Sequence, residues 1–567
     1  MILINFLSSL CQQAFEQAFP SLDLPKITVS PSTKSIFGHY QCNDAMKLAK
    51  KLNISPRKIA EKIVPILFQK EIFKDISIAG PGFINLTLSE SFLSQELKNL
   101  SKNLTPGRFI QKQETIVVDF SSPNIAKEMH VGHLRSTIIG DSIAKVFEFL
   151  GHKVIRLNHV GDWGTSFGML ITYLIDENLQ NTSNLTDLTF LYKKAKKRFD
   201  EDEDFKQRSR QTVVALQQED PEIMNLWKNI CQISRKSFNE IYSMLSIKLE
   251  ERGESFYNTL LPDIVEDLKE KKLAVLSEGA WCIFHEGLPS PLMIQKQDGS
   301  YNYDTTDMAA MYYRVSIDNA DRIIIVTDSG QSLHFELIKK TAEKAGYLKN
   351  TKFDHVTFGL VLDVNNKKFK TRSGETIKLL DLLNTSIEKA SCLLLEHDPK
   401  ISQKELEEKA KILGINAIKY ADLSNHRIND YIFSFDKMLR FDGNTATFIL
   451  YSYVRIYGLK RFLHLSEKDL ENMLETNSIY LNHPSEIALA IHLLRFPETI
   501  IKVAEELTPH FIANYLYNLA EKFNAFFRDC RVQGSKYQNS RILLAHLTEK
   551  IFAQGAKLLG LELLTHL

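Results

Sequence analysis

The chain has 567 residues, of which 44% are hydrophobic, 25% charged and 10% aromatic. This is the composition of an ordinary globular protein, and it excludes a disordered, a collagenous or a disulfide-scaffold chain. At about 150 residues per domain, the length predicts three to four domains. Seventy basic residues against sixty-nine acidic ones leave a net charge of +1, so any polyanion-binding surface must be local.

Cysteine usage and hydropathy indicate a cytoplasmic protein. Six cysteines are scattered without a C-x-x-C pair, which predicts free thiols and no structural zinc site. No apolar run approaches the roughly 18 residues of a membrane span. The opening segment is apolar, but its first basic residue is Lys26, so we expect no signal or transit peptide.

Residues 1–110 predict a small α+β domain. Its strand candidates are 26–30, 75–80 and 82–88, and its helix candidates are 44–51 and 56–68. Over residues 1–108, 13 Lys and Arg stand against 8 Asp and Glu, a local excess of +5. This excess predicts either a module that binds a polyanion or an ordinary solvated surface.

Residues 111–435 predict an α/β domain with a parallel sheet of the Rossmann type. Two strand–helix–strand patterns occur, at 115–158 and at 322–362; each is typical of a βαβ unit. The segment between them, around 175–300, mixes charged helices with short strands and is interpreted as an insertion. From about 376 the apolar spacing is helical, and residues 436–567 predict an all-helical C-terminal domain.

The loop after the first of these strands, residues 121–133, carries the most informative pattern. It leads into a helix, whose N-terminal N–H groups and dipole favour an anion. His130 and His133 are three residues apart and fall on one helical face, and Gly132 allows a ligand to approach. Two imidazole donors at this place suit a phosphate whose charge grows in a transition state. Zinc ligation, or histidines with a purely structural role, are the alternatives.

Several longer stretches give this loop a family resemblance. His130–His133, H-V-G-H, resembles the HIGH signature of class I aminoacyl-tRNA synthetases, and the run SSPNIAKEMHVGHLRST resembles that of the arginyl-tRNA synthetases. The segment NHVGDWGTSFG is similar too, except that Ser166 stands where the family usually has Gln. FGHYQCNDA resembles the family's domain that touches the tRNA elbow, and RFDGNTA resembles the entry to its anticodon-binding helices. The resemblance covers essentially the whole chain.

The resemblance implies a three-domain ligase. Residues 1–110 would bind the tRNA elbow, 111–435 would catalyse, and 436–567 would bind the anticodon. ATP with Mg²⁺ would activate L-arginine to arginyl-adenylate, with transfer to the 3′ end of tRNA(Arg) and release of AMP and diphosphate. We expect a cytoplasmic monomer that does not contact a membrane. We also expect it to have no protein-bound structural metal and no editing domain. A different class I synthetase, or a catalytically silent tRNA-binding relative, is the competing interpretation.

The resemblance also implies which residues bind each substrate. The arginine-binding residues would be Asp119, Ser121, Asn124, Glu254, Tyr303, Asp307 and Gln331. Of these, Tyr303, Asp307 and Gln331 would surround the guanidinium, while Asp119, Asn124 and Glu254 would hold the amino and carboxyl ends or orient the pocket. A guanidinium needs a carboxylate that accepts a forked pair of hydrogen bonds. Asp304 competes with Asp307 for this role, and helix capping is the alternative for Asp307.

The ATP and tRNA residues follow in the same way. ATP would be bound by His130, Gly132, His133, Phe358, Gly359 and Lys370. The family's KMSKS loop is replaced by KKFKTRSGE, in which Lys370 and Arg372 are the candidate catalytic cations, and Lys127 would reach the phosphates from the opposite wall. Solvent-facing lysines are the alternative. Tyr40, Gln41 and Asn43 would contact tRNA, unless they belong to an ordinary turn.

Overall fold

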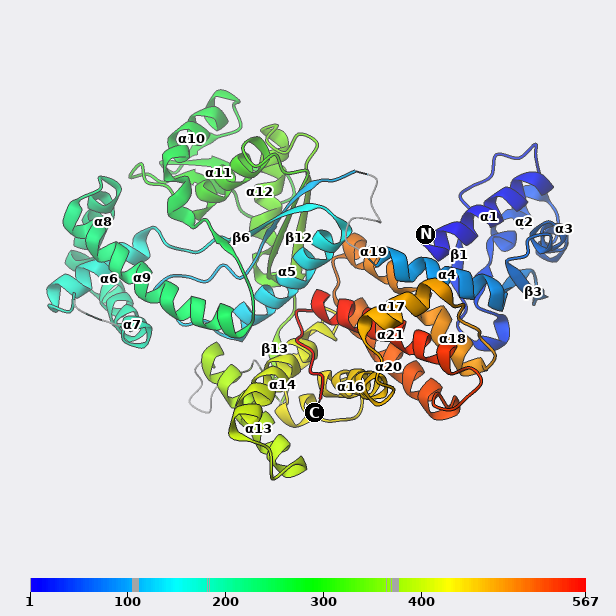
Figure 1. Cartoon of the computed structure of the whole chain (residues 1–567). Coiled ribbons are helices and arrows are strands. Elements are labelled where there is room, and N and C mark those ends of the chain that lie inside the picture. Colours follow the sequence, from blue (N-terminus) through cyan, green and yellow to red (C-terminus); the bar gives the residue numbers. More distant parts are fainter. Residues whose placement is uncertain are drawn as a thin grey trace.

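The computed structural model describes residues 2–104, 112–180, 182, 184–363, 365–367, 369 and 377–566. Figure 1 shows three parts: a small N-terminal unit, a central sheet with helices around it, and a bundle of C-terminal helices. The N-terminal unit lies beside the C-terminal helices, although the two are far apart in the sequence (Figure 1). In the described part of the chain no helix is long and apolar enough to cross a membrane.

The N-terminal unit is an antiparallel sheet covered by helices. The strand order is β1-β2-β4-β3. Ser55 accepts a hydrogen bond from the Lys58 amide and Pro56 opens the next helix, so this helix begins where its cap predicts. The elements are α1 Leu3–Ala18, β1 Val29–Pro31, η1 Ser35–Phe37, β2 Tyr40–Cys42, α2 Asp44–Leu52, α3 Pro56–Phe68, β3 Phe73–Ala79, β4 Phe83–Leu88 and α4 Glu90–Asn103.

The central sheet has five parallel strands in the order β12-β11-β5-β6-β7. The chain runs from β5 to β6 on one side and returns to β11 on the other, so the order reverses beside β5. Ligands bind at such reversals, outside the carboxyl ends of the strands. The elements are β5 Thr115–Asp119, α5 Val131–Leu150, β6 Lys153–Asn158, β7 Glu250–Glu251, β11 Arg322–Asp328, η3 Ser329–Gln331, α12 Ser332–Lys344 and β12 Lys352–Phe358.

The expected insertion consists of helices and a small antiparallel sheet of order β10-β9-β8. Helices α6, α7 and α8 stand apart from the central sheet, at one end of the molecule (Figure 1). The elements are α6 Thr165–Asp176, α7 Leu185–Glu201, α8 Glu203–Gln217, α9 Pro221–Met244, η2 Glu254–Leu260, α10 Leu261–Glu270, β8 Val275–Ser277, β9 Ala280–Ile283, β10 Leu292–Gln295 and α11 Tyr303–Ser316.

The strand–helix–strand pattern expected over 322–362 ends in two strands rather than one. After β12, β13 (Val361–Leu362) leaves the central sheet and pairs with β14 (Tyr431–Ile432). The break falls at Gly359, whose amide donates to the Arg427 carbonyl at 2.9 Å. The remaining elements are α13 Leu379–His397, α14 Gln403–Leu423, α15 Phe435–Met438, α16 Ala446–Phe462, α17 Glu467–Thr476, α18 Pro484–Leu494, α19 Phe496–Glu506, α20 His510–Asp529 and α21 Gln538–Leu558.

Candidate active site

The loop between β5 and α5 is held in an irregular shape by buried hydrogen bonds. Ser121 and Ser122 have positive φ values of 75° and 46°. The Ser121 hydroxyl lies 2.8 Å from the Tyr242 hydroxyl, and the Ser122 amide donates to Asn158 Oδ1 at 3.0 Å. These bonds join the ends of β5 and β6 to α9. Because its hydroxyl is occupied within the protein, Ser121 orients the loop.

Asp119, at the end of β5, forms a buried ion pair. Its Oδ2 lies 2.6 Å from Arg314 Nη2, and its Oδ1 accepts from the Ser122 hydroxyl at 3.1 Å. Both charged side chains are nearly inaccessible to solvent. Of the two expected roles, holding the substrate or orienting the pocket, this geometry favours orientation. Sequence reasoning did not find Arg314, which is the only charged residue in an otherwise uncharged turn of α11.

The two histidines of H-V-G-H meet at the start of α5. His130 is the N-cap and accepts from the Gly132 amide at Nδ1, while His133 Nδ1 accepts from the His130 amide at 3.0 Å. The ring centroids are 4.0 Å apart. A Cβ on Gly132 would lie 2.9 Å from His130 Cε1, so glycine permits this contact.

The bonding at Nδ1 fixes where each neutral ring carries its proton. Because Nδ1 accepts in both histidines, the hydrogen of the neutral imidazole is at Nε2. Burial, with smaller contributions from the charges of His130 and Lys127, lowers the pKa of His133 to about 3. At neutral pH His133 is therefore an uncharged donor, and its capping bond aims that donor away from the helix.

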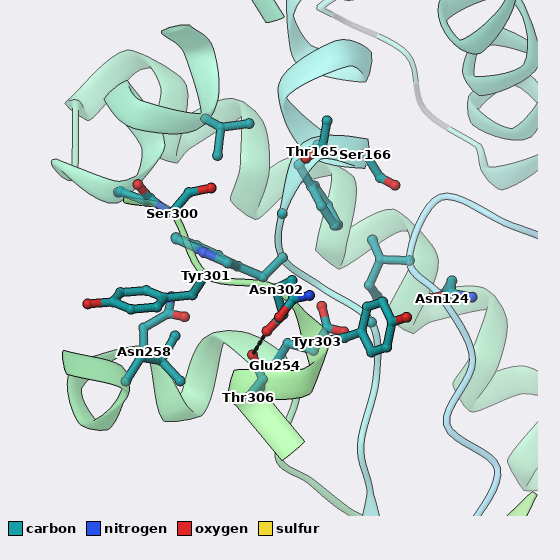
Figure 2. A pocket seen from close by; sticks show the side chains of 18 of the residues that line it. Asn124, Thr165, Ser166, Glu254, Asn258, Ser300, Tyr301, Asn302, Tyr303 and Thr306 are labelled. Carbon is teal, nitrogen blue, oxygen red and sulfur yellow. Dashed lines mark hydrogen bonds between the residues drawn. The ribbon is translucent and has the colours of Figure 1, made fainter. Parts of the chain in front are cut away.

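A cavity of about 460 Å³ lies next to this loop. Among the predicted site residues it is lined by Asn124, Lys127, Glu254 and Tyr303. Figure 2 shows Asn124 on one side, with Asn258 and Tyr301 on the other. The ammonium of Lys127 lies 4.7 Å from the Tyr192 ring centre, a cation–π contact on this wall. Of the other predicted residues, those that the structure describes do not line the cavity.

Glu254 is held in place by the segment N-H-V-G-D-W-G, residues 158–164. Its amide donates to the Val160 carbonyl at 3.1 Å, and the Asp162 carboxylate accepts from the Ser255 amide and hydroxyl at 2.8 and 2.7 Å. Burial, together with the charges of Asp307 and Asp162, raises the pKa of Glu254 to about 8. Asp162 thus helps to position Glu254 by holding the next residue, Ser255. Sequence reasoning did not single out Asp162.

Asp307 lies within α11, one turn after Tyr303, and Asn302 is the N-cap; the capping alternative for Asp307 is therefore wrong. His334 Nε2 is 2.6 Å from Asp307 Oδ2, and His159 Nε2 is 3.5 Å from Oδ1. Burial raises the pKa of Asp307, but the hydrogen bond and charge of His334 outweigh it, so the pKa is lowered.

Gln331 ends η3 and is exposed. Among the described residues no hydrogen bond joins it to Asp307, and His334, one turn further along, occupies that place instead. Tyr303 is 59% exposed, and its ring centre lies 5.2 Å from that of His334. Tyr303 and Asp307 are thus brought together, whereas Gln331 is not. His334 could have been considered from the sequence, because it is the histidine of S-L-H-F, directly after the segment that contains Gln331.

Phe358 and Gly359, the predicted adenine contact, lie at the turn between β12 and β13. The Gly359 amide donates a hydrogen bond to the Arg427 carbonyl, and the Gly359 carbonyl accepts one from Arg135 Nη1 at 2.7 Å. Phe358 is buried, with the Arg135 guanidinium 5.6 Å from its ring centre. The Gly359 amide is thus engaged within the protein, whereas its carbonyl oxygen can accept a second hydrogen bond, and the adenine contact of Phe358 and Gly359 stays a prediction. Arg135, buried and 3.0 Å from Asp422, ties α5 to this turn.

Lys370 and Arg372 lie outside the described residues. The chain that follows them is fixed against the histidine loop. The Leu379 amide donates to the Met129 carbonyl at 2.8 Å, and Lys378 Nζ is 3.0 Å from Glu128 Oε1. This contact brings the next described segment to the start of α5, although 250 residues separate the two.

The prediction that Tyr40 contacts tRNA is wrong for its ring. Tyr40 is fully buried, its hydroxyl donates to Glu498 at 3.1 Å, and the Arg495 guanidinium lies 4.9 Å from its ring centre. Burial, partly offset by the Ile4 amide and Arg495, raises the pKa of Glu498 to about 7. Because it packs against the C-terminal helices, the ring has no free face for a base.

Gln41, in β2, and Asn43, directly after this strand, are half-buried. Gln41 donates to Asn85 Oδ1 at 2.7 Å, and Asn43 donates to Gln41 at 3.3 Å. This polar row keeps the two side chains oriented, and their contact with tRNA stays a prediction.

Family models match the chain in three successive parts. The model for the class I (R) tRNA synthetase catalytic domain matches residues 95–435. The DALR anticodon binding domain matches 449–567, and the arginyl-tRNA synthetase N-terminal domain matches 5–88. The chain belongs to the arginyl-tRNA synthetases.

Relatives support the same family over full length. The arginine–tRNA ligases of Chlamydia felis and Protochlamydia amoebophila are 57% and 54% identical, with 100% and 99% of this chain and 100% and 98% of theirs covered. The arginyl-tRNA synthetase of Plasmodium falciparum has a TM-score of 0.88 at 36% identity, covering 100% of this chain and 99% of its own. That of Thermus thermophilus, at 21% identity and TM-score 0.81, shares the fold over 99% of this chain and 100% of its own.

Family membership confirms the expected activity and fold class. As an arginyl-tRNA synthetase the chain is a ligase that uses ATP to activate arginine and transfers it to tRNA. The parallel sheet with its N-terminal unit and helical C-terminal part is the architecture that the sequence predicts. A different class I synthetase is excluded as an interpretation.

Proposed function

We propose that arginine is activated between α11 and the loop before α5, with the Asp307 carboxylate binding the guanidinium. The carrying observation is that Tyr303 and Glu254 line the cavity although they lie 49 residues apart in sequence (303 − 254), and that the charge of Asp307 acts on both. Asp304 is the weaker candidate, because its Oδ2 already accepts from the Met293 amide at 3.1 Å. Glu254 and Asn124 would then hold the amino and carboxyl ends.

In the proposed first step, an oxygen of the arginine carboxylate attacks the α-phosphorus of ATP. The bond to the β-phosphate breaks, and diphosphate leaves with its electron pair. The Nε2–H donors of His130 and His133 would stabilise the charge that grows on the α-phosphate. Lys127, Lys370 and Arg372 would receive the leaving diphosphate. No protein nucleophile is needed, because positioning and electrostatics carry the step.

The second step transfers the arginyl group. A ribose hydroxyl at the 3′ end of tRNA(Arg) attacks the carbonyl carbon of the adenylate, and AMP leaves. ATP would enter as its magnesium complex. Histidine, glycine and lysine predominate where the phosphates would lie, so phosphate oxygens would supply most ligands of Mg²⁺.

Residues 1–110 and 436–567 are proposed to bind the elbow and anticodon parts of tRNA, in a cytoplasmic monomer. The +5 excess of the N-terminal segment supports this, since each phosphate contact by Lys or Arg releases counterions. We expect the affinity for tRNA(Arg) to fall steeply as salt is raised. An affinity that does not change with salt would mean that the charge excess is only a solvated surface.

The proposed assignments are tested by ATP–diphosphate exchange with and without tRNA. Asp307→Ala should abolish arginine-dependent exchange and leave tRNA binding nearly intact. A pocket of buried polar groups rejects mismatched ligands by about 10⁴–10⁵-fold, so the loss should be nearly complete. Wild-type exchange by this variant would move the guanidinium site to Asp304 or elsewhere.

A further inference from the structure

The imidazole of His334 is held between two carboxylates. Its Nε2 lies 2.6 Å from Asp307 Oδ2 and its Nδ1 lies 3.2 Å from Asp304 Oδ1. Both aspartates project from the first two turns of α11, and His334 comes from the facing helix α12. An imidazole that meets a carboxylate at each nitrogen must donate at both, and only the imidazolium does so. The geometry thus calls for a protonated His334.

The two carboxylates are not equivalent. Asp304 is buried and also accepts from the Met293 amide, so it is anchored to β10. Asp307 has its second oxygen 3.5 Å from His159 Nε2, beyond a good hydrogen bond. Asp304 is therefore the anchor of the imidazole, and Asp307 is the carboxylate with capacity left for a ligand.

The titratable and charged groups that face this cluster among the described residues come from several elements. Burial and nearby cations lower the pKa of His355, on β12, to about 4. His159, whose Nδ1 is buried without a hydrogen-bond partner in the described structure, faces Asp307 from the loop after β6. Tyr303 presents an uncharged phenol, and Glu254, with its pKa of about 8, is mostly protonated at pH 7. Arg314, further along α11, is matched by its own partner, Asp119.

Two carboxylates and one imidazolium leave a net charge of −1 on the cluster of Asp304, Asp307 and His334. Burial lowers the pKa of His334, but its hydrogen bonds to Asp304 and Asp307 raise it to about 9. A single guanidinium carries the complementary +1 charge.

We propose that His334 is a positioning residue for arginine: clamped by Asp304, it orients Asp307 and leaves one uncompensated negative charge for the guanidinium. This inference rests on the proposed role of Asp307. If Asp304 lost its charge, the His334 imidazolium would pair with Asp307 alone. It would then neutralise Asp307 and compete with the substrate guanidinium for this carboxylate. Removing His334 as well would free Asp307 again.

The test is a double-mutant cycle on the full-length protein, with L-arginine binding measured by calorimetry. Asp304→Asn should weaken arginine binding by up to about 100-fold, from one unit charge at ~6 Å and an effective dielectric of ~20. The double variant Asp304→Asn/His334→Gln should bind arginine at least about tenfold more tightly than Asp304→Asn alone. A double variant as weak as Asp304→Asn, or weaker, would overturn the proposal.

Two controls separate charge balance from structural damage. The pair Asp304→Asn/His355→Gln removes a neighbouring histidine that is neutral, so it should give no recovery. His334→Gln alone should change the KM for arginine rather than kcat, because His334 lies away from the reacting atoms. Recovery with His355→Gln, or a loss confined to kcat, would contradict a positioning role.

The protonation state of His334 can also be read directly in the wild-type protein, with one variant used only to assign its resonances. In protein labelled with ¹⁵N-histidine, the resonances that His334→Gln removes should show both ring nitrogens protonated at pH 7.5. A neutral tautomer at that pH would overturn the inference. Asp307→Asn distinguishes this failure from that of the proposed function: if it leaves arginine binding intact, the guanidinium assignment itself is wrong.

Discussion

The raised pKa of Glu254 predicts a pH-dependent stability that Glu254→Gln should remove. The carboxyl group has its ordinary pKa of 4.5 when unfolded and a pKa of about 8 when folded. Between these values the folded state keeps a proton that the unfolded state has lost. The contribution of this group is therefore greatest below pH 4.5 and is lost as pH rises through 8.

The size of the effect follows from linkage. Each pH unit between the two pKa values is worth at most about 1.4 kcal/mol, so from pH 5.5 to 7.5 the wild type loses up to about 2.7 kcal/mol through Glu254. Glutamine has the same shape and does not titrate. The stability difference between Glu254→Gln and wild type should therefore move in favour of the variant by up to this amount.

The assay is urea unfolding of both proteins at pH 5.5, 6.5 and 7.5, followed by the fluorescence of the tryptophans. Trp163, whose amide stabilises the Glu254 carboxylate, makes the signal local to this region. Arginine should shift the wild-type curve more than the variant curve at pH 7.5, if the substrate ammonium pairs with ionised Glu254. Parallel pH dependences in the two proteins would refute the raised pKa.

Three further predictions follow from the site. His133→Gln should raise the activation free energy of adenylate formation by about 2.7–4 kcal/mol and so lower kcat. A change in the KM for ATP alone would instead mean that His133 contacts ATP only in the ground state. Lys127→Ala should cost activation about as much as losing a histidine, and with Lys370→Ala the free energies should not add; full exchange activity by Lys127→Ala would contradict this. Gly359→Ala places a Cβ 2.6 Å from oxygens of the facing turn and should destabilise by about 1–3 kcal/mol in thermal unfolding. Gly458→Ala, with no atom within 4 Å of the added Cβ, is its control, and equal effects would refute the steric argument.

Local patterns in the sequence determined the elements of this protein. Pro56 after a capping serine and Gly151 after an apolar stripe place helix ends, because caps and left-handed residues act within a few positions. The alternation of strands with helices predicts the parallel sheet. The histidine loop and its family resemblance likewise depend on a continuous run of residues, so they are legible without a structure.

Tertiary structure alone decided how charges far apart in the sequence are paired. Asp119 meets Arg314 at a separation of 195 residues, and Asp307 meets His334 across two helices. Gln331 and His334 are one helical turn apart, so spacing could not say which of them faces Asp307. The burial of Tyr40 could not be foreseen, because its partners, Glu498 and Arg495, come from the other end of the chain. Pairing and burial depend on which elements pack together, and sequence periodicity records only which face of each element is apolar.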